Sequence, residues 1–463
     1  MSRVLLFSTY DLGRQPCGLA SPAAWLRRAG HEVRTADLTR TKLDADDVRA
    51  AQVIAFFLPM HTATRLAIPV IDRVRTINPS AHLCAYGLYA PLNAEVLRAH
   101  GVATILGPEF ERDLVQVAQD FPLDAEATAF AGPGRTTPAG PPSFRFQAEG
   151  LPRLAFIQPD RSDLPPLARY ASLQIGDARK VVGYTEATRG CKHRCRHCPI
   201  VPIYDGTFRV VPVDVVLADI RAQVDAGAQH ITFGDPDFFN GPRHAMAVAG
   251  ALHEAFPHVS YDVTIKVEHL LAHRVLLPRL RDTNCAFVVS AVESIDDAVL
   301  AKLEKGHTGA DFEAVVAAFD ETGLALAPTF VAFTPWTTLD GYCELLRTID
   351  RLGLVPAVAP IQYAIRLLIP QGSRMLELEE VRHRVTHFDA QSLTHVWRHE
   401  DARVDGVHRS LEALVGARLN APREDVFGRV WTLAHEAAGL AAPARAPLPS
   451  RATIPFLNEP WYC

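Results

Sequence analysis

The stretch TEATRGCKHRCRHCP, residues 185–199, decides the fold of this chain because it places three cysteines on one short loop. Cys191, Cys195 and Cys198 follow the spacing CxxxCxxC. The chain has 8 cysteines in 463 residues and the others lie singly, so chance is a poor explanation of the cluster. Clustered thiols in a chain without a disulfide framework indicate a metal site.

The cysteine loop allows two kinds of metal site. Three thiolates can hold three irons of a 4Fe–4S cluster and leave the fourth iron open. A structural zinc site needs four ligands, and His193 or His197 could supply the fourth. Inert buried thiols are disfavoured because Lys192, Arg194 and Arg196 make the loop cationic, which favours thiolates and an anionic cofactor.

After the cysteine loop, strands and helices alternate. A helix is predicted over 213–224, where apolar residues recur at helical spacing, with Pro212 at its start and Gly227 after its end. The alternation gives about six βα units in some 200 residues, which favours a partial barrel, since a full barrel needs about 250 residues. The other predicted elements are a helix over 244–256 and strands over 230–234, 260–265, 285–290, 327–333 and 355–363.

The first 130 residues alternate strand and helix in shorter units. Buried strands separated by helices of about ten residues favour a doubly wound parallel sheet, that is, a Rossmann-like domain. The predicted strands cover 3–8, 32–35, 52–58 and 81–87, and the predicted helices cover 21–29 and 64–77.

Stretches rich in proline and glycine separate these parts of the chain. AGPGRTTPAGPPSFRF and QPDRSDLPPL read as a linker with extended pieces. The predicted fold class is α/β. Its predicted order is a Rossmann-like domain over 1–130, a linker over 131–180, a partial (βα)6 barrel of the TIM type over 181–385, and a helical C-terminal extension with an aromatic tail over 386–463.

Composition excludes several partners. The formal net charge is −5 and the pI is about 6.4, so nothing attracts the whole chain to nucleic acid or to an anionic membrane. No apolar run approaches the roughly 18 residues that a membrane-spanning helix needs. The N-terminus lacks the features of a secretory signal. We therefore expect a cytoplasmic protein without a nucleic-acid or membrane partner.

The cysteine loop resembles the signature of the radical SAM superfamily, in which CxxxCxxC follows the first strand of a partial (βα)6 barrel. The resemblance extends over about residues 151–385. It implies that Cys191, Cys195 and Cys198 ligate a 4Fe–4S cluster whose open iron chelates S-adenosylmethionine (SAM). An electron then cleaves the sulfonium bond and releases a 5′-deoxyadenosyl radical. His197 departs from the pattern, because the family often has an aromatic residue there.

The segment after the second barrel strand resembles the one that holds the SAM amino group. In GDPDFFN, residues 234–240, Gly234 permits close approach of the backbone. Asp235 or Asp237 could accept a hydrogen bond from the ammonium. The alternative is an acidic turn between a strand and a helix.

Later strand ends carry further candidates by the same resemblance. Lys266 could pair with the SAM carboxylate, although a solvated lysine fits the sequence nearly as well. Ser290 and Glu293 suit the ribose or methionine end of SAM. Gln362 and Arg366 could face the substrate, but a packed strand is the stronger alternative for both.

The N-terminal domain resembles the cobalamin-binding type found ahead of many radical SAM barrels. The loop YGLYAPLN, residues 86–93, follows a predicted strand, as in that group. The D-x-H-x-x-G motif, whose histidine would ligate cobalt, is absent from the sequence. Cobalamin without a protein ligand, an empty structural domain, and substrate or partner binding all stay open.

The ending LNEPWYC, residues 457–463, resembles a small radical SAM group with a Cys-Cys-Ala-Glu-Pro tail, in which selenocysteine can replace the second cysteine. Cys463 stands where that tail would begin, so a selenocysteine codon read as a stop is one interpretation. A frayed end with one free thiol is the other. If the tail docks at the barrel mouth, Cys463 is a candidate catalytic thiol that handles substrate.

Together these features predict a radical SAM enzyme that cleaves SAM at a 4Fe–4S cluster and acts on a small molecule. A reductant such as flavodoxin or ferredoxin would supply the electron. One alternative is a cobalamin-dependent radical SAM methyltransferase. The other is a non-catalytic binding protein stabilised by zinc.

Overall fold

A computed structural model describes residues 1–122, 154–419, 421–445 and 455–458 of the chain. These residues belong to two units, Met1–Asp11 with Pro16–Pro165, and Leu12–Gln15 with Pro166–Cys463. Each unit has its own sheet. In the described ranges, no helix combines the length and the apolar character needed to cross a membrane.

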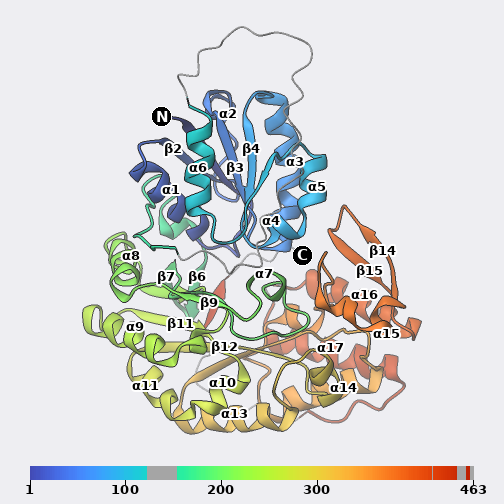
Figure 1. Ribbon diagram of the computed structural model, residues 1–463. Helices are drawn as coiled ribbons and strands as arrows, with labels where there is room; N and C mark the ends of the chain where they lie inside the picture. Colours follow the sequence, from blue (N-terminus) through green and yellow to red (C-terminus); the bar gives the residue numbers. More distant parts are fainter. Residues whose placement is uncertain (123–153, 420, 446–454, 459–463) are drawn as a thin grey trace. The chain divides into compact units, whose positions relative to one another are not determined.

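The first unit is built on a five-stranded parallel sheet with the order β2-β1-β3-β4-β5. Figure 1 shows α1 and α6 on one face of this sheet and α3 and α5 on the other. This arrangement confirms the predicted doubly wound fold. The strands are β1 (Arg3–Ser8), β2 (Glu32–Asp37), β3 (Val53–Phe57), β4 (His82–Tyr86) and β5 (Thr104–Ile105); the helices are α1 (Cys17–Arg28), α2 (Ala45–Ala50), α3 (His61–Ile77), α4 (Tyr89–Leu92), α5 (Ala94–Ala99) and α6 (Glu111–Asp120).

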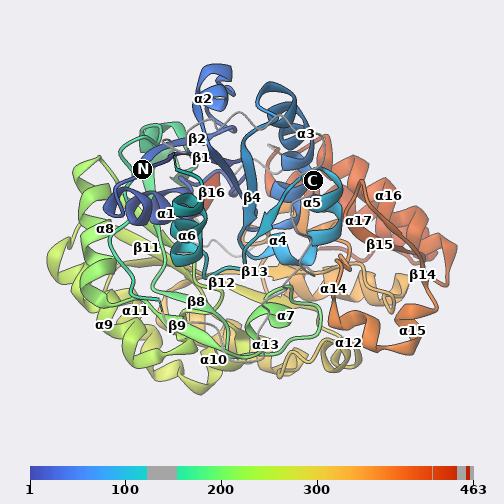
Figure 2. The same cartoon turned by 45° about the horizontal axis from the view of Figure 1, so that its top comes forward.

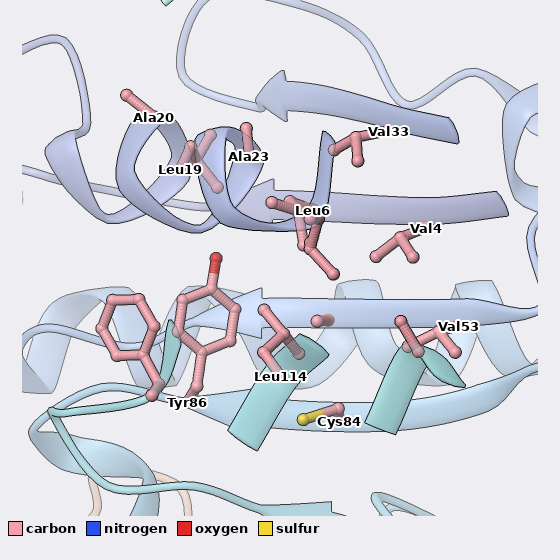
Figure 3. Close-up of a cluster of buried hydrophobic side chains, with 14 of the residues drawn as sticks. Val4, Leu6, Leu19, Ala20, Ala23, Val33, Val53, Cys84, Tyr86 and Leu114 are labelled. Atoms are coloured by element: carbon pink, nitrogen blue, oxygen red, sulfur yellow. The ribbon is translucent and has the colours of Figure 1, made fainter. Parts of the chain in front are cut away.

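Helices on both faces explain why the strands of this unit read as continuous apolar runs. Val4 and Leu6 of β1 lie against Leu19 and Ala23 of α1, and Leu114 of α6 joins the same buried cluster (Figure 3). The helices therefore bury the sheet and leave the carboxyl ends of its strands as the place for a ligand.

The second unit contains a seven-stranded sheet with the order β13-β12-β11-β10-β7-β6-β16. Its five strands from β7 to β13 are parallel, whereas β6 and β16 extend one edge as antiparallel strands. This confirms a partial barrel. The strands are β6 (Ser172–Ile175), β7 (Ala178–Thr185), β10 (His230–Phe233), β11 (Ser260–Thr264), β12 (Cys285–Glu293), β13 (Ala325–Phe330) and β16 (Phe456–Asn458).

Helices cover the outer face of this sheet; α8, α9, α11 and α13 follow its curve in Figure 1 and Figure 2. Two hairpins, β8 (Thr188–Gly190) with β9 (Phe208–Val210) and β14 (Val385–Asp389) with β15 (Thr394–Trp397), lie outside it. The helices are α7 (Val201–Tyr204), α8 (Val213–Asp225), α9 (Pro242–Ala255), α10 (Val267–Ala272), α11 (Leu277–Asp282), α12 (Asp297–Lys302), α13 (Gly309–Thr322), α14 (Leu339–Arg351), α15 (Glu379–Arg382), α16 (Ala402–Gly416) and α17 (Arg423–Ala438), and short 3-10 turns cover Leu167–Arg169, Phe238–Asn240, Arg274–Leu276, Pro360–Tyr363 and Arg374–Glu377.

Side-chain caps hold the starts of α12 and α13. The carboxylate of Asp296 accepts hydrogen bonds from the first turn of α12. Thr308 and Asp311 form a capping box at the start of α13. The capping box holds the C-terminal end of the loop between α12 and α13, and this loop carries Lys305 of the site described below.

The prediction for residues 355–363 was wrong, because Pro360–Tyr363 form a 3-10 turn instead of a strand. Pro356 and Pro360 cannot donate to a sheet ladder, so a central strand cannot run through them. The sixth position of the partial barrel is instead a single parallel bridge between Phe333 and Arg366.

Two further boundaries need correction. Ser172–Ile175 and the first residues of β7 lie in the barrel sheet, although 131–180 was predicted as a linker. The extension after 386 is not entirely helical, because β14 and β15 form a hairpin ahead of α16 and α17. The hairpin turn is set by Asp389, whose carboxylate accepts from the N–H groups of Gln391 and Ser392.

Candidate active site at the carboxyl edge of the barrel sheet

The cysteine loop follows β8, beyond the carboxyl end of β7, which is the edge where barrel sites are built. The side chain of Asn240 holds the loop: its amide donates to the carbonyl of Gly190 at 3.2 Å and its oxygen accepts from the N–H of Lys192 at 3.1 Å. Cys191 lies between these two anchors. The backbone N–H of Arg196 donates to the carbonyl of Leu303 at 2.8 Å and anchors the other half of the loop.

A glycine is required immediately before the first cysteine. Gly190 has a φ of +77°, and a Cβ there would lie 2.4 Å from the ring of Tyr204 and 2.6 Å from the carbonyl oxygen of Thr207. Only glycine tolerates both the backbone conformation and the close neighbours.

Cys195 is buried, and Cys191 and Cys198 are half-buried. Cys195 is 7% exposed. Burial raises the pKa of Cys191 to about 11 and that of Cys198 to about 12. Metal binding must displace those protons, since only thiolates ligate iron. Three sulfur donors on one short, partly buried loop fit an iron–sulfur cluster.

A network of charged and imidazole groups lies on the Cys191 side of the loop; we call it the Asp237 network. Lys266 Nζ lies 2.9 Å from Glu268 Oε2 and 3.2 Å from His193 Nδ1. His269 Nδ1 lies 2.6 Å from Asp237 Oδ2, and His193 Nε2 lies 3.4 Å from the same oxygen. Burial would raise the pKa of Asp237, but His193 and His269 lower it below its usual range.

A second network, which we call the Glu293 network, lies on the side of Cys195 and Cys198. Glu293 Oε1 lies 3.2 Å from His197 Nε2 and 3.3 Å from Lys305 Nζ. Burial would raise the pKa of Glu293, but Lys305 and His197 lower it to about 2. The group is therefore a buried carboxylate paired with a buried ammonium. Charges held this close to a metal loop are typical of a functional site.

The backbone of Glu293 is itself unusual. Its φ is +67°, a left-handed conformation that is rare for a residue with a side chain. It ends β12, where the pairing with β13 shifts register after Ala291. The irregular strand end turns the carboxylate toward His197 and Lys305.

The two networks approach each other at Gly306, the residue after Lys305. A Cβ at Gly306 would lie 2.7 Å from Glu268 Oε2 and 3.5 Å from Lys266 Nζ. Residues that follow β10, β11 and β12 therefore meet beside the cysteine loop. The structure brings together Asp237, Lys266 and Glu293 of the predicted site.

Three predicted residues have other positions. Asp235 is 2% exposed, and both its oxygens are engaged, by the N–H of Ala187 at 2.9 Å and by the hydroxyl of Thr188 at 2.5 Å. Burial raises its pKa to about 7. Gly234 packs against Tyr184, whose hydroxyl would lie 1.8 Å from an added Cβ. Ser290 is fully buried in β12, and its hydroxyl has no hydrogen-bond partner.

Gln362 and Arg366 make contacts within the protein. The side-chain oxygen of Gln362 accepts from the N–H of Phe330 at 2.9 Å. The guanidinium of Arg366 donates to Asp405 at 2.8 Å and lies 3.5 Å from the ring centre of Trp397. Both side chains hold the segment at the sixth position of the partial barrel against the protein segments beside it.

Sequence reasoning missed His269 and Lys305, and it weighed His193 and His197 only as zinc ligands. His269 lies in α10 and Lys305 in the loop after α12, far from the cysteines in sequence. The sequence carries no signal for either residue, because the burial of Lys305 is seen only in the structure. Cys463 and the residues around it lie outside the described residues.

Comparisons with known proteins agree with this geometry. Residues 185–335 match the family model described as the radical SAM superfamily. The hopanoid C-3 methylase of Methylococcus capsulatus is 23% identical over 343 residues, which cover 72% of this chain. The same alignment covers 64% of that relative, so this chain spans less than two thirds of its length.

Solved structures show the fold of both units. The cobalamin-dependent S-adenosylmethionine radical enzyme OxsB, with aqua-cobalamin and S-adenosylmethionine bound, matches 94% of this chain and 72% of its own at 12% identity, with a TM-score of 0.65. The radical S-adenosylmethionine methyltransferase TsrM from Kitasatospora setae matches 76% of this chain and 71% of its own at 16% identity, with a TM-score of 0.55.

Proposed function

We propose that this chain, whose residues 185–335 match the radical SAM superfamily, cleaves SAM reductively and starts radical chemistry on a small molecule. The observation that carries the proposal is the loop with Cys191, Cys195 and Cys198, held at the carboxyl edge of the partial barrel between two charged networks. A 4Fe–4S cluster bound there would supply the electron and an open iron for SAM.

Within that site, we propose that Lys266 and Glu293 contact SAM. Lys266 presents a buried ammonium that suits the carboxylate of the methionine part. Glu293 presents a carboxylate that suits a ribose hydroxyl, and Lys305 and His197 hold it in place. Asp235 has both oxygens engaged within the protein, so it does not carry this role.

The decisive experiment is anaerobic reconstitution with iron and sulfide, followed by reduction in the presence of SAM. We expect a brown protein with about four irons per chain that forms 5′-deoxyadenosine. Replacing Cys195 with Ala should abolish cluster formation and SAM cleavage together, whereas Cys84→Ala, in the N-terminal core, should keep both. A colourless protein that retains zinc would instead support the binding-protein alternative.

A second candidate function is cobalamin-dependent methyl transfer, and the N-terminal sheet favours it. The order β2-β1-β3-β4-β5 has its switch point between β1 and β3, where doubly wound folds bind ligands. Ser8 ends β1 at this point, and its buried hydroxyl has no hydrogen-bond partner within the described part of the chain. An unpaired polar group at this edge fits a cofactor with polar side chains, and OxsB, which shares the fold, binds aqua-cobalamin.

Cobalamin binding can be measured directly. We expect hydroxocobalamin to remain with the protein through gel filtration and the Ser8→Val variant to retain less of it. S-adenosylhomocysteine among the products would then indicate methyl transfer. A protein that makes 5′-deoxyadenosine but retains no cobalamin would support reductive SAM cleavage and would contradict cobalamin-dependent methyl transfer. For the electron donor we propose flavodoxin or ferredoxin.

A further inference from the structure

We infer that His193, Asp237 and His269 form a binding site for one divalent transition-metal ion, distinct from the three cysteines. Each residue offers one ligand atom, and these atoms all lie within 4.8 Å of one another. They come from three segments: the cysteine loop, the turn after β10, and α10. The arrangement is thus a product of the fold and not of one helix or one turn.

Unsatisfied polar atoms point to a ligand at this place. The side chains of Asp237 and His269 are 2% and 5% exposed. Asp237 Oδ2 and His269 Nδ1 are 2.6 Å apart, yet among the described residues neither atom meets the geometry of a hydrogen bond. Buried polar atoms are almost always satisfied, because leaving one unpaired costs about 1–3 kcal/mol. A cation on Asp237 Oδ2 and His269 Nε2 would satisfy the carboxylate and would leave the ring proton of His269 on Nδ1, which faces Asp237.

The distances suit a small ion. Zinc lies about 2.0–2.1 Å from histidine nitrogen and carboxylate oxygen, so two ligands of a tetrahedral site are about 3.3 Å apart. His193 Nε2 lies 3.2 Å from His269 Nε2 and 3.4 Å from Asp237 Oδ2. His269 would bind through Nε2, the nitrogen that already faces His193. Three protein ligands leave a fourth position open, as in catalytic sites.

The surrounding charges are compatible with a cation. A metal on Nε2 of His193 leaves the ring proton on Nδ1, which lies 3.7 Å from Glu268 Oε2 and 3.2 Å from Lys266 Nζ, so Lys266 would have to direct its donors to Glu268 alone. At this distance the Glu268 carboxylate favours the protonated Nδ1 and a metal on Nε2 through its charge and not through a hydrogen bond. Lys266 is already paired with Glu268 at 2.9 Å, so its charge is offset. Two imidazoles and a carboxylate select zinc or iron(II) in preference to magnesium or calcium.

The test uses cluster-loaded protein, in which iron occupies the cysteines, equilibrated with zinc and then passed through gel filtration. We expect about one zinc per chain. His269→Gln and His193→Gln should each weaken zinc binding by at least about tenfold. His273→Gln is the matched control, because His273 lies next to His269, with ring centres 6.0 Å apart, but outside the site; it should keep its zinc.

A second protein separates this site from the cysteines. The triple variant Cys191→Ser, Cys195→Ser, Cys198→Ser should still bind one zinc, and X-ray absorption should show nitrogen and oxygen neighbours without sulfur. Zinc that is absent from the cluster-loaded protein, lost in the triple variant, or retained in both histidine variants would overturn the inference. Zinc content is independent of 5′-deoxyadenosine formation, so failure of the proposed function would be recognised separately.

Discussion

Asp235 and Asp237 show how little a residue's type says about its role. Both follow β10 and both are almost fully buried. Asp235 accepts hydrogen bonds from the backbone and side chain of the segment before the cysteine loop, whereas Asp237 faces two imidazoles. The difference comes from the partners that the fold supplies, and its consequences for titration can be measured.

The protonation of Asp235 should make the free energy of unfolding depend on pH. Its carboxyl has an ordinary pKa of 3.8, which burial raises to about 7 in the folded chain. Between these values the folded state holds a proton that the unfolded state has released, so this group's contribution to stability falls as pH rises. Asp235→Asn removes that dependence. The free energy of unfolding of the wild type relative to the variant should fall by roughly 3 kcal/mol between about pH 5 and pH 8.

Urea unfolding at several pH values measures this difference. An asparagine can accept from Ala187 and donate to the hydroxyl of Thr188, so the variant should fold. A wild-type-to-variant difference that stays constant with pH would show that the folded pKa of Asp235 is near its ordinary value.

The ion pair of Glu293 and Lys305 should behave as a unit. The side chains are 11% and 4% exposed, and removing one charge of a buried pair leaves the other uncompensated, at about 3–5 kcal/mol. Glu293→Gln should therefore lower the free energy of unfolding by about that amount. Combining it with Lys305→Met should recover part of the loss. Chemical unfolding of the two single variants and the double variant tests this, and purely additive losses would contradict it.

The part of the site that could be predicted from sequence is the local part. Cys191, Cys195 and Cys198 lie within eight residues, and their spacing alone indicates a metal. His269 and Lys305 lie about 75 and 110 residues further on, and only the parallel packing of strands brings their segments to one edge. Pairing across that distance leaves no periodic signal in the sequence.

At the scale of elements, apolar runs located the strands well. The prediction for 3–8 matches β1, and the helix predicted over 213–224 matches α8 to within one residue. The hairpin of β14 and β15 was missed because its turn rests on the Asp389 carboxylate and on Leu393 with a φ of +53°. Neither the side-chain hydrogen bonds nor the left-handed leucine can be read from hydrophobic periodicity.

The turn into the cysteine loop should be intolerant of a side chain. Gly190→Ala combines a φ of +77° with a contact of 2.4 Å, so it should lower both thermal stability and iron content. Gly227→Ala is the matched control, because Gly227 has a φ of +98° but nothing within 4 Å of an added Cβ. In Gly227→Ala the free energy of unfolding should fall only by the backbone strain, about 1–2 kcal/mol.

Iron per chain and the thermal midpoint, measured for both alanine variants, distinguish the two effects. Equal losses in the two variants would mean that backbone conformation alone matters. A full iron content in Gly190→Ala would show that the loop can shift to accommodate the methyl group.

At the scale of the molecule, each unit has its own sheet and its own core. In the second unit, β16 brings residues from the far end of the chain onto the edge strand β6. Pairing this edge covers hydrogen-bonding groups that would otherwise be open to other chains. The pairing was not predictable, because β16 spans only Phe456–Asn458.

Leu457 should anchor β16. It packs against the cluster of Leu173, Val182 and Phe287, so Leu457→Asp should cost about 2–5 kcal/mol and expose this end to proteases. Asn458→Asp introduces the same charge at an exposed neighbour and should change little. Limited proteolysis and thermal unfolding compare the two. Equal resistance in both variants would show that β16 contributes nothing to stability.

The polarity of β16 has a practical consequence. It is antiparallel to β6, which is antiparallel to β7, so it advances in the same sense as the barrel strands that end beneath Cys191. Asn458 is level with Ser172 and, through it, with Val181. A label attached at Asn458 would therefore lie on the sheet edge beside Ser172 and Val181, and a label at Met1 is the comparison to make.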